Sequence, residues 1–556
     1  MAGMQYADGY GPVAAPVDRL LASTSDARDA TTASGFVAWS ETFEAHLAYI
    51  ALVLSIACIT PLDSLVSAHS GALFGLGLLA VWRYGWGLTH FVRSNIYRSI
   101  DFPKMRAKAE DAMRKSADTL GDQHVFFLVT SFRIDSDTTA AVYRAAFEAA
   151  KRAPGGATVV ASIVEMGDQR LIKLLYKLIC GEDTKVCLVI TRIAGTGKRD
   201  ALAYGFRAIS RQEPKADDVV AVIDGDSIVP PDLVKKCVGF FRADNNVGAL
   251  TTDEVSHVHG KAKFHIWYSL RFAQRHILMS SNGLSRKVLT LTGRMSMFRA
   301  SIICNPDFVR QVESDYVDHW RFGRLKFLTG DDKSSWFWLL RNGYRMLYIP
   351  DVVVATVEEP PSKYFLPAAT QLMVRWFGNM LRTNSRALAL GSSKVGFFTW
   401  WTIFDQRVSM WTSLAGLAMV LLVGLFETPF AFLIYLLWVL ATRYLLTLML
   451  FNSRRRVSAF YPFFIYFNQI YGSIIKTYIF FHLNKQRWTR QKTTLADGRT
   501  GFESRVREVS SALVHVLAIT LFITIVALVL GQLEIPDASI LAMAYGLDPE
   551  KLREWI

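Results

Sequence analysis

Residues 219–227 read Val-Val-Ala-Val-Ile-Asp224-Gly-Asp226-Ser227, and this stretch decides the fold of the chain. Its run of five apolar residues, most of them β-branched, predicts a buried strand that ends in two acids. Alternate residues of an extended chain point the same way, so the carboxylates of Asp224 and Asp226 can face one site. Carboxylate oxygens suit Mg²⁺ or Mn²⁺, and either ion can neutralise a diphosphate. The stretch therefore predicts a metal site at a strand end, and the alternative is a solvated turn.

Short β-rich runs on both sides of this stretch alternate with helical patterns. The runs cover residues 124–130, 157–164, 185–191, 218–223 and 248–252, and helical patterns cover residues 138–152 and 200–211. Strand–helix–strand alternation of this length predicts an α/β domain with a mainly parallel sheet. Ligands of such sheets bind at the carboxyl ends of the strands, where the two acids lie.

The composition argues against a wholly soluble enzyme. The chain has 556 residues, of which 51% are hydrophobic, and its mean hydropathy is +0.22. These values exclude intrinsic disorder for most of the chain. The net charge of +14 is typical of Lys/Arg-rich loops on the cytoplasmic side of a membrane, and no nucleic-acid-binding module accompanies it. None of the five cysteines forms a C-x-x-C pair, so neither a disulfide framework nor a zinc site is expected.

Long apolar runs flank the α/β region and predict membrane helices. Two runs precede it, at about residues 45–62 and 71–92, and four follow, at about residues 408–425, 429–450, 460–482 and 511–530. The link 61–70 has no Lys or Arg, whereas the residues after Arg93 are rich in both. By the positive-inside rule, the α/β region is cytoplasmic.

The run 460–482 differs from the others because basic residues lie on both of its sides. It also carries Asn468, Gln469 and Lys476 among many aromatic residues. These features favour a helix that lies in the membrane interface, which leaves five spans. The alternative is a sixth span with a basic outer loop.

Two later motifs have candidate roles. Gly330-Asp331-Asp332 opens a predicted helix, where paired acids either cap the helix or supply a general base for a hydroxyl group. Arg375 and Trp376 lie in another helical stretch. A guanidinium can clamp a diphosphate and an indole can stack on a sugar ring, although such pairs are more often interfacial anchors.

Lys198 belongs to a stretch that superficially resembles a phosphate-binding loop. The Walker pattern fails, because Arg192 stands where its first glycine belongs and Arg199 replaces its Ser or Thr. Lys198 nevertheless follows a predicted strand closely and can reach a phosphate. The pair His257 and His259 has no acid or Cys at ligand spacing, so a surface turn is expected there.

The order of these features resembles the membrane-embedded, processive family-2 glycosyltransferases, which include cellulose, hyaluronan and chitin synthases. Two spans, Asp-Gly-Asp, Gly-Asp-Asp, Arg-Trp and further spans follow one another over residues 45–530. The resemblance implies an α/β cytoplasmic GT-A glycosyltransferase domain embedded in an α-helical membrane domain that forms a channel. One departure is that Leu372 stands where most processive members have Gln. Gln371 lies one residue earlier, about 100° around the helix, so an acceptor contact by this Gln is in doubt.

Longer stretches are similar to the alginate (mannuronan) synthases within this family. They are residues 81–86, 89–93, 197–203, 250–254, 270–276, 288–296, 326–338 and 375–379. This similarity implies processive, inverting transfer of mannuronate from GDP-mannuronate onto a β-1,4-linked polymannuronate chain, which is exported across the bacterial inner membrane. The alternatives are a synthase of another polysaccharide, such as a glucan or mannan made from a UDP- or GDP-sugar, and an inactive membrane scaffold.

The resemblance also assigns roles to residues. It makes Asp332 the base and lets Asp331 orient the site. Asp226, as the preferred ligand, and Asp224 would hold Mg²⁺ or Mn²⁺ and the diphosphate. Arg375 and Lys198 would bind the diphosphate, and Trp376 would stack on the acceptor.

Five further residues have expected roles near the substrates. Glu165 and Asp168 follow the second strand and are candidates for reading the nucleoside. Trp488-Thr-Arg490 resembles the gating segment that closes over bound nucleotide in this superfamily; the alternative is a basic membrane-surface loop. Arg294 is a candidate for binding the sugar carboxylate.

The resemblance further implies a partner, a membrane co-polymerase subunit that binds cyclic di-guanylate. The other expected partners are GDP-mannuronate, the nascent chain and the lipid bilayer. The predicted division of the chain is a flexible cytoplasmic tail (1–44), two transmembrane helices (45–92), the GT-A domain (93–365), interfacial helices with the Arg-Trp motif (366–405), two transmembrane helices (406–451), an interfacial helix and gating-like loop (452–509), a transmembrane helix (510–532) and a periplasmic tail (533–556).

Overall fold

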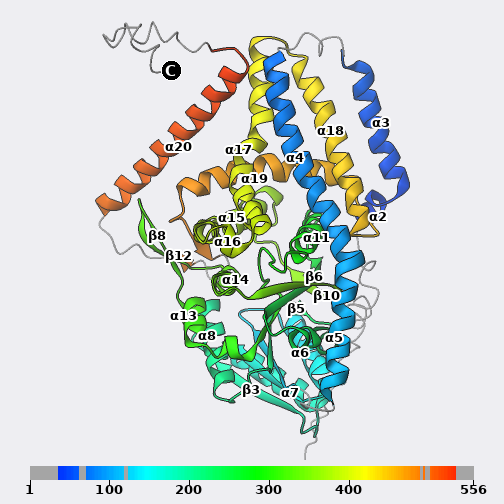
Figure 1. The fold of residues 1–556 in the computed structure, drawn as a ribbon, viewed down its shortest axis with the longest axis vertical. Coiled ribbons are helices and arrows are strands. Elements are labelled where there is room, and N and C mark those ends of the chain that lie inside the picture. The colour runs from blue at the N-terminus through cyan, green and yellow to red at the C-terminus, as the bar shows by residue number, and fades with distance from the viewer. Residues whose placement is uncertain (1–34, 62–69, 118–122, 489–492, 495–500, 534–556) are drawn as a thin grey trace, which may run out of the picture.

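The computed structural model describes residues 35–61, 70–117, 123–488, 493–494 and 501–533. Its lower half in Figure 1 is an α/β domain, and its upper half is a group of long helices. The predicted tails of residues 1–44 and 533–556 lie largely outside the described residues. Within the first of them, α2 (Gly35–Ser40) buries Val37 against Ile266 and Leu270.

One eight-stranded sheet forms the centre of the α/β domain, in the order β3-β2-β1-β4-β7-β6-β10-β5. The strands are β1 (Val125–Thr130), β2 (Ala157–Ile163), β3 (Val186–Arg192), β4 (Val219–Asp224), β5 (Ser227–Ile228), β6 (Val247–Val258), β7 (Met295–Arg299) and β10 (Arg345–Glu358). Only β7 and β5 pair antiparallel with their neighbours. The prediction of a mainly parallel α/β sheet is therefore confirmed, and the carboxyl ends of β1, β2, β4 and β6 share one edge.

The central strands are apolar because both faces of the sheet are covered. Every residue of β1 and β2 is buried. The units β1–α6–β2 and β3–α8–β4 cross in opposite directions along the sheet, which places their helices on opposite faces. The helices of this domain are α5 (Phe102–Ala117), α6 (Ser136–Lys151), α7 (Met166–Ile179), α8 (Lys198–Ser210), α9 (Leu233–Cys237), α10 (Gly239–Ala243), α11 (Ala262–Gly283), α12 (Ala300–Ile303), α13 (Pro306–Glu313) and α14 (Asp331–Arg341), and the hairpin β8 (Tyr316–His319) and β9 (Gly323–Lys326) accompanies them.

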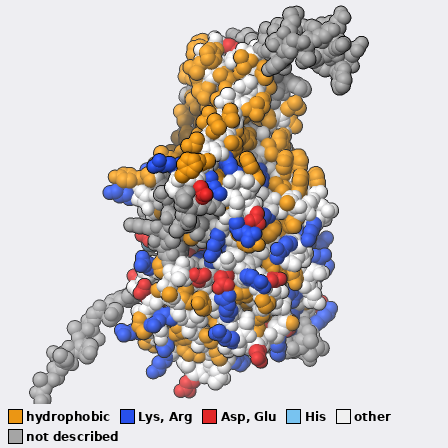
Figure 2. All heavy atoms as spheres, turned by 90° about the vertical axis from the view of Figure 1, so that its left-hand side faces the viewer, with side chains coloured by type: hydrophobic (Ala, Val, Ile, Leu, Met, Phe, Trp, Pro, Cys, Tyr) orange, Lys and Arg blue, Asp and Glu red, His pale blue; other side chains and the backbone are white. Residues whose placement is uncertain are grey.

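Long apolar helices stand above the sheet (Figure 1). They are α3 (Phe43–Ile59), α4 (Ser70–Ile96), α17 (Phe397–Phe426), α18 (Ala431–Met449) and α20 (Gly501–Val529). Among the described residues, three helices are long and apolar enough to cross a membrane, namely α17, α18 with its extension η3 (Leu450–Asn452), and α20. Figure 2 shows hydrophobic side chains gathered over these helices, whereas charged side chains cover the α/β domain. The arrangement is that of a membrane protein with an attached α/β domain.

Helix α19 (Tyr461–Phe481) runs across the lower ends of the upright helices in Figure 1. It packs against α15 (Phe365–Ala389), which carries the Arg-Trp motif, and against α17 and α18. The short helix α16 (Ser392–Val395) links α15 to α17. The number of spans, five or six, stays a prediction.

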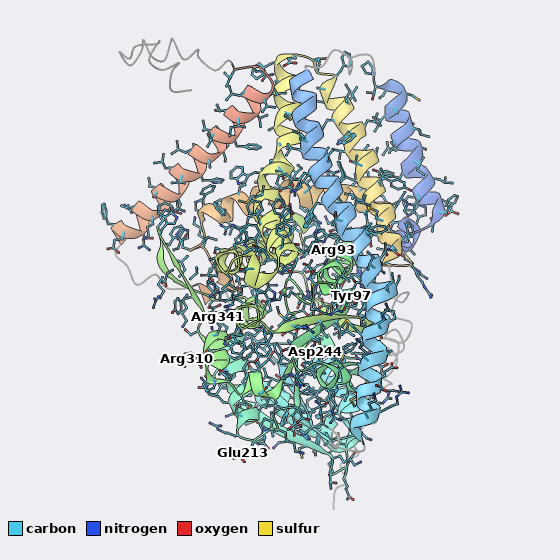
Figure 3. The ribbon with its side chains drawn as sticks, in the orientation of Figure 1. Arg93, Tyr97, Glu213, Asp244, Arg310 and Arg341 are labelled. Carbon is cyan, nitrogen blue, oxygen red and sulfur yellow. The ribbon has the colours of Figure 1, made fainter. Side chains whose placement is uncertain are left out.

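Helix α4 passes directly into the α/β domain through a π-helical turn, η2 (Tyr97–Asp101), and then α5. Tyr97, labelled in Figure 3, is fully buried at this joint. Its hydroxyl donates a hydrogen bond to the Tyr348 carbonyl at 2.5 Å. Gly283 of α11 lies against the Tyr97 ring, where an added Cβ would be 2.8 Å from Cζ. Helix α4 is thus joined to the α/β domain through a closely packed turn.

Candidate active site

Strand β4 delivers Asp224 and Asp226, both half-buried, to the shared carboxyl edge of the sheet. The residue between them has to be glycine because the chain is tightly packed there. The Gly225 N–H donates to the Thr130 carbonyl at 2.9 Å, and an added Cβ would lie 2.6 Å from Ser131 Oγ. Close packing against the end of β1 therefore fixes the directions of the two carboxylates.

Lys198, the first residue of α8, joins this strand end to the start of α14. Its Nζ lies 2.5 Å from Asp224 Oδ1 and 3.3 Å from Asp331 Oδ2. Burial lowers the pKa of Lys198, but the two carboxylates outweigh it and hold the pKa above its usual value. Gly293 lies against the same cluster, where an added Cβ would be 2.7 Å from Lys198 Nζ and 2.8 Å from Asp224 Oδ2. The structure thus brings together three of the predicted site residues.

The turn before α14 presents Asp331 and Asp332. Gly330 has a φ of 87°, a left-handed conformation that favours glycine, and an added Cβ would lie 2.8 Å from Asn379 Cγ. A cavity of about 20 Å³ is lined by Gly293, Asp331 and Asp332 together with core residues of α8 and β4. The two predicted acids therefore lie beside the Asp224 end of β4.

Different surroundings give the paired acids different affinities for protons. Burial raises the pKa of Asp331, but Lys198 and Arg199 outweigh it and hold the pKa below its usual value. Burial raises the pKa of Asp332, and the neighbouring charge of Asp331 raises it further. Two adjacent carboxyl groups with pKa values shifted in opposite directions are typical of an acid–base site.

Arg199 holds the turn before α14 in place and is itself almost fully buried. Its guanidinium donates to the carbonyls of Val312 at 2.7 Å and Thr329 at 2.9 Å, and to Ser334 Oγ at 3.1 Å. Sequence reasoning noticed Arg199 only as a mismatch to the Walker pattern. Its role depends on partners more than a hundred residues away, which no local pattern reveals.

The Arg-Trp motif lies on α15. The Trp376 ring is 5.9 Å from the Trp267 ring, and the Arg271 guanidinium stacks on it at 3.3 Å from the ring centroid. Arg375 and Trp376 are both half-buried, while Leu372 is buried and Gln371 is exposed. Gln371 and Leu372 therefore occupy different faces of the helix, as the rotation per residue requires. Arg271 was not predicted from the sequence.

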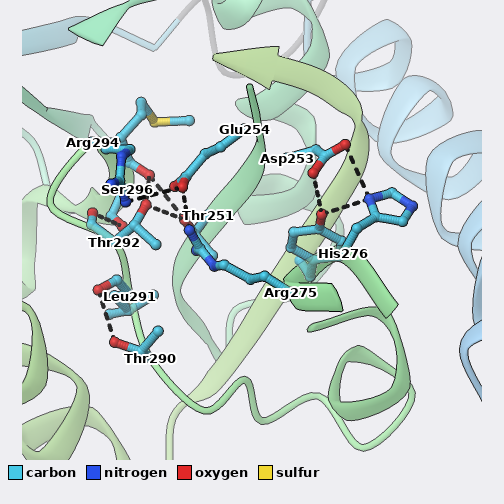
Figure 4. Close-up of polar contacts among 12 residues, drawn as sticks. Thr251, Asp253, Glu254, Arg275, His276, Thr290, Leu291, Thr292, Arg294 and Ser296 are labelled. Carbon is cyan, nitrogen blue, oxygen red and sulfur yellow. Dashed lines mark hydrogen bonds and ion pairs between the residues drawn. The ribbon is translucent and has the colours of Figure 1, made fainter. Parts of the chain in front are cut away.

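Arg294 directly precedes β7 and is paired with two carboxylates, of which Figure 4 shows Glu254. Its guanidinium donates to Glu254 at 3.3 Å and also to Glu358, and Arg275 shares Glu254. Burial lowers the pKa of Arg294, but both carboxylates outweigh it and raise the pKa. The predicted contact with a sugar carboxylate would add a third partner to this guanidinium.

The candidates for reading the nucleoside lie at the carboxyl end of β2. Glu165 precedes α7 and is exposed, and Asp168 lies in its first turn. Burial, and then the charge of Glu165, raises the pKa of Asp168. They share the sheet edge with Asp224 but contribute no contact to the Lys198 cluster.

The predicted gating segment lies at the edge of the described chain. Trp488 belongs to the short strand β11 (Arg487–Trp488), which pairs with β12 (Thr493–Thr494), whereas Arg490 lies outside the described residues. The buried residue before them, Gln486, accepts a hydrogen bond from Leu328 N at 3.1 Å and donates to the Lys326 carbonyl at 2.8 Å. The start of the segment is thus tied to the chain that leads into the Gly330 turn, a contact that sequence reasoning missed.

The two acids of β4 fit a divalent cation that takes most of its ligands from a diphosphate. Mg²⁺ commonly binds one or two carboxylates together with substrate phosphates and water. Among the described residues, no group of three or more His, Cys, Asp or Glu side chains forms a complete cage. In the described part of the chain, Asp224 and Asp226 are the residues that would hold the ion.

We expect the Gly330 turn to tolerate no side chain. Gly330→Ala should destabilise the protein by about 1–3 kcal/mol more than Gly343→Ala. Both positions have a positive φ, 87° and 79°, but only Gly330 has a neighbour within 4 Å of an added Cβ. The measurement is the thermal melting temperature of the two purified variants in the same detergent, and equal shifts would contradict the close approach of Asn379.

Part of the chain matches a family model, and a solved structure resembles it more distantly. Residues 123–379 match the sequence model described as glycosyltransferase like family 2. Among solved structures, a mannosyltransferase PcManGT from Pyrobaculum calidifontis in complex with GDP-Man and Mn²⁺ aligns with a TM-score of 0.43 at 16% identity, over 70% of this chain and 98% of that one.

Two curated relatives align over nearly their whole length. The glycosyltransferase alg8 of Pseudomonas syringae pv. tomato is 47% identical over 480 residues, which are 86% of this chain and 96% of the relative. The glycosyltransferase alg8 of Azotobacter vinelandii is 47% identical over 453 residues, which are 82% of this chain and 91% of the relative. The predicted fold class, a GT-A-like domain joined to membrane helices, is confirmed. The chain therefore belongs to the alg8 glycosyltransferases of family 2, the catalytic subunits of alginate synthase.

Proposed function

We propose that this alginate-related glycosyltransferase polymerises mannuronate from GDP-mannuronate into β-1,4-linked polymannuronate and passes the chain through the bacterial inner membrane. The observation that carries the proposal is the Lys198 bridge between Asp224 and Asp331, with Asp332 beside it. The bridge joins the strand end that would bind the diphosphate to Asp331, and the neighbouring carboxyl group of Asp332 has a raised pKa. The α/β domain would face the cytoplasm, where nucleotide sugars are made.

Asp332 would act as the general base. Its carboxylate would take the proton from the 4-hydroxyl of the growing chain while that oxygen attacks C1 of the donor sugar. The bond between C1 and the diphosphate oxygen breaks in the same step, so GDP leaves and the configuration inverts. Burial and the charge of Asp331 raise the pKa of Asp332, which makes the ionised form a stronger base.

The other residues would position the two substrates. Asp224 and Asp226 would hold Mg²⁺ or Mn²⁺, and that ion would neutralise the charge that grows on the departing diphosphate. Lys198 and Arg375 would bind the same diphosphate, since ammonium and guanidinium groups both pair with phosphate. Trp376 would stack on the acceptor sugar, with Arg271 on the indole as its support.

The remaining assignments concern recognition and control. Glu165 and Asp168 would contact the nucleoside, and Arg294 the sugar carboxylate. Trp488 and Arg490 would close over the bound nucleotide. Gln486 supports this gating role, because it bonds the start of that segment to the chain before Asp331. A membrane co-polymerase subunit that binds cyclic di-guanylate would be needed for full activity.

The first test compares donors in membranes that hold this protein, a cyclic di-guanylate-binding partner and the dinucleotide. GDP-mannuronate, GDP-mannose, UDP-glucose and UDP-N-acetylglucosamine are each supplied with Mg²⁺ or Mn²⁺. We expect GDP release and alginate-lyase-sensitive polymer from GDP-mannuronate alone. Asp332→Asn should lower the rate at least about 100-fold, because the base is lost. Asp318→Asn, in an exposed ion pair with Arg324, is the matched control and should stay active.

Each outcome of this test has a clear meaning. Polymer from another donor would replace mannuronate but keep the mechanism. Full activity of Asp332→Asn would remove Asp332 as the base. If the wild-type protein gives no product with any donor, the result would favour the scaffold alternative.

The second prediction concerns pH. A base works only when it is ionised, so turnover should fall as pH drops through the raised pKa of Asp332. The acid limb of the pH–rate profile should therefore lie above the usual range of an aspartate. Asp331→Asn removes the neighbouring negative charge and should move this limb to lower pH. The measurement is kcat against pH, and an acid limb that does not move in Asp331→Asn would contradict the coupling.

A further inference from the structure

The hairpin of β8 and β9 extends from the α/β domain toward the membrane helices. Its strands pair antiparallel, with Tyr316 opposite Lys326 and His319 opposite Gly323. In Figure 1, β8 lies between α13 and the lower end of α20. We call residues 320–322, which connect the two strands, the hairpin tip. None of the roles proposed above uses the hairpin tip, so its position needs an explanation of its own.

One face of the hairpin is buried, and this burial sets its orientation. Val317 of β8 and Leu325 of β9 belong to an apolar cluster with Ile479 of α19 and Leu483 just beyond it. Side chains alternate between the two faces of a strand, so the neighbouring Tyr316 faces outward and is exposed. The hairpin therefore packs on α19 through one face and presents its other face away from the protein.

Two hydrogen bonds hold the hairpin tip against the ends of α19 and α20. Arg321 donates to the carbonyl of Phe481, the last residue of α19, at 2.6 Å. Arg507, in the second turn of α20, donates to the carbonyl of Phe322 at 3.0 Å. Helix α20 is one of the described helices that are long and apolar enough to cross a membrane. The hairpin tip is therefore fixed beside the start of a candidate membrane span.

The surface of α20 shows at which level of the membrane this contact lies. Exposed apolar side chains begin on α20 at Phe502 and continue through Val506 and Val509, a spacing that places them along one side of the helix. Phe502 precedes Arg507 by roughly 7.5 Å of helix, at 1.5 Å per residue. Arg507 and the exposed Glu508 lie among these apolar residues. Charged and apolar side chains mixed at the end of a span are typical of the headgroup layer.

Trp320 is the exposed residue of the hairpin tip. It is 85% exposed, and its ring contacts among the described residues are with its own neighbours, His319 at 5.9 Å and Arg321 at 5.8 Å. A single exposed apolar side chain on a soluble surface needs no explanation. Trp320, however, lies at the end of a membrane span, where the apolar body and polar N–H of an indole suit the boundary between lipid and water.

We propose that the hairpin tip inserts Trp320 into the headgroup layer of the bilayer beside α20, and that the hairpin is thereby a membrane anchor of the α/β domain. The continuity of the tip with the exposed apolar surface of α20 favours lipid over a protein partner. On the outward face of the hairpin, Arg324 pairs with Asp318 at 2.9 Å. The indole therefore provides the contact, and an anionic lipid is not required.

The anchor would also steady the chain that follows the hairpin. Strand β9 ends at Lys326, and the Gly330 turn follows within four residues. The Lys326 carbonyl accepts a hydrogen bond from Gln486 at 2.8 Å. A hairpin held at the membrane surface thus fixes one end of the segment that carries Asp331 and Asp332.

The test places a photoreactive residue, p-benzoylphenylalanine, at position 320 of the full-length protein. The protein is reconstituted in nanodiscs of phosphatidylcholine, with and without phosphatidylglycerol, and adducts are identified by mass spectrometry after illumination. The matched control carries the same residue at the position of Tyr204, an exposed aromatic residue of α8 in the α/β domain. A lipid-facing reference carries it at the position of Leu517, an exposed residue of α20. The melting temperature of each protein shows whether it is folded.

We expect lipid adducts at positions 320 and 517 and none at position 204, with the same yield at position 320 in both lipid mixtures. The proposal is overturned if position 320 gives no lipid adduct, or if position 204 gives as much. Adducts between position 320 and a second protein molecule in place of lipid would show a protein interface and also overturn it. A lipid adduct that needs phosphatidylglycerol would contradict a contact made by the indole. Crosslinking requires no substrate, so the result is independent of the proposed function.

Discussion

Lys198 is the point on which the site depends, because its ammonium group lies between two carboxylates that belong to separate parts of the domain. Asp224 ends a central strand, and Asp331 begins a helix more than a hundred residues later. Without the ammonium group, the buried negative charges of Asp224, Asp331 and Asp332 would repel one another at close range. The lysine therefore permits three carboxyl groups to lie close together at the place where the cation and the base are proposed. Gly293 is part of the same arrangement, since any side chain there would occupy the space of the ion pair.

A layer of arginines connects this cluster to the membrane-proximal helices. Arg199 bonds to the turn before Asp331, and Ser334, one of its partners, also donates to Asp315 at 2.6 Å. Arg386 of α15 forms a bidentate pair with that same Asp315. Arg382, one turn earlier on α15, donates to Asn379 and to the Leu483 carbonyl beyond α19. The turn that carries Asp331 and Asp332, the Arg-Trp helix and the segment that leads to Trp488 are therefore held as one unit. A displacement of α15 or α19 would reach the turn before Asp331 through these bonds.

Sequence patterns predicted the strands and the acidic motifs well, because these depend on local signals. The apolar run before Asp224 is a buried strand, and Gly330-Asp331-Asp332 opens a helix. Local sequence patterns could not predict hydrogen bonds and ion pairs between residues that are distant in sequence. Arg294 looked available for a substrate, yet its two carboxylate partners lie 40 and 64 residues away. In the sequence, Arg199 was only a mismatch to the phosphate-loop pattern. In the structure, it is buried and its hydrogen bonds hold the turn before Asp331. The strands β7 and β10 also escaped notice, since β7 is only five residues long and β10 is interrupted by its bulge.

Strand β6 places two neighbouring acids on opposite faces of the sheet (Figure 4). Asp253 faces His276, Tyr348 and Arg454, while Glu254 faces Arg275 and Arg294 on the other side. A one-residue insertion or deletion within this strand would exchange the two faces and leave both sets of cations opposite the wrong side chains. The number of residues in β6 is thus constrained, and point substitutions do not test this constraint. Related chains should vary in length in their loops, and the distance along the chain from Val247 to Val258 should stay unchanged.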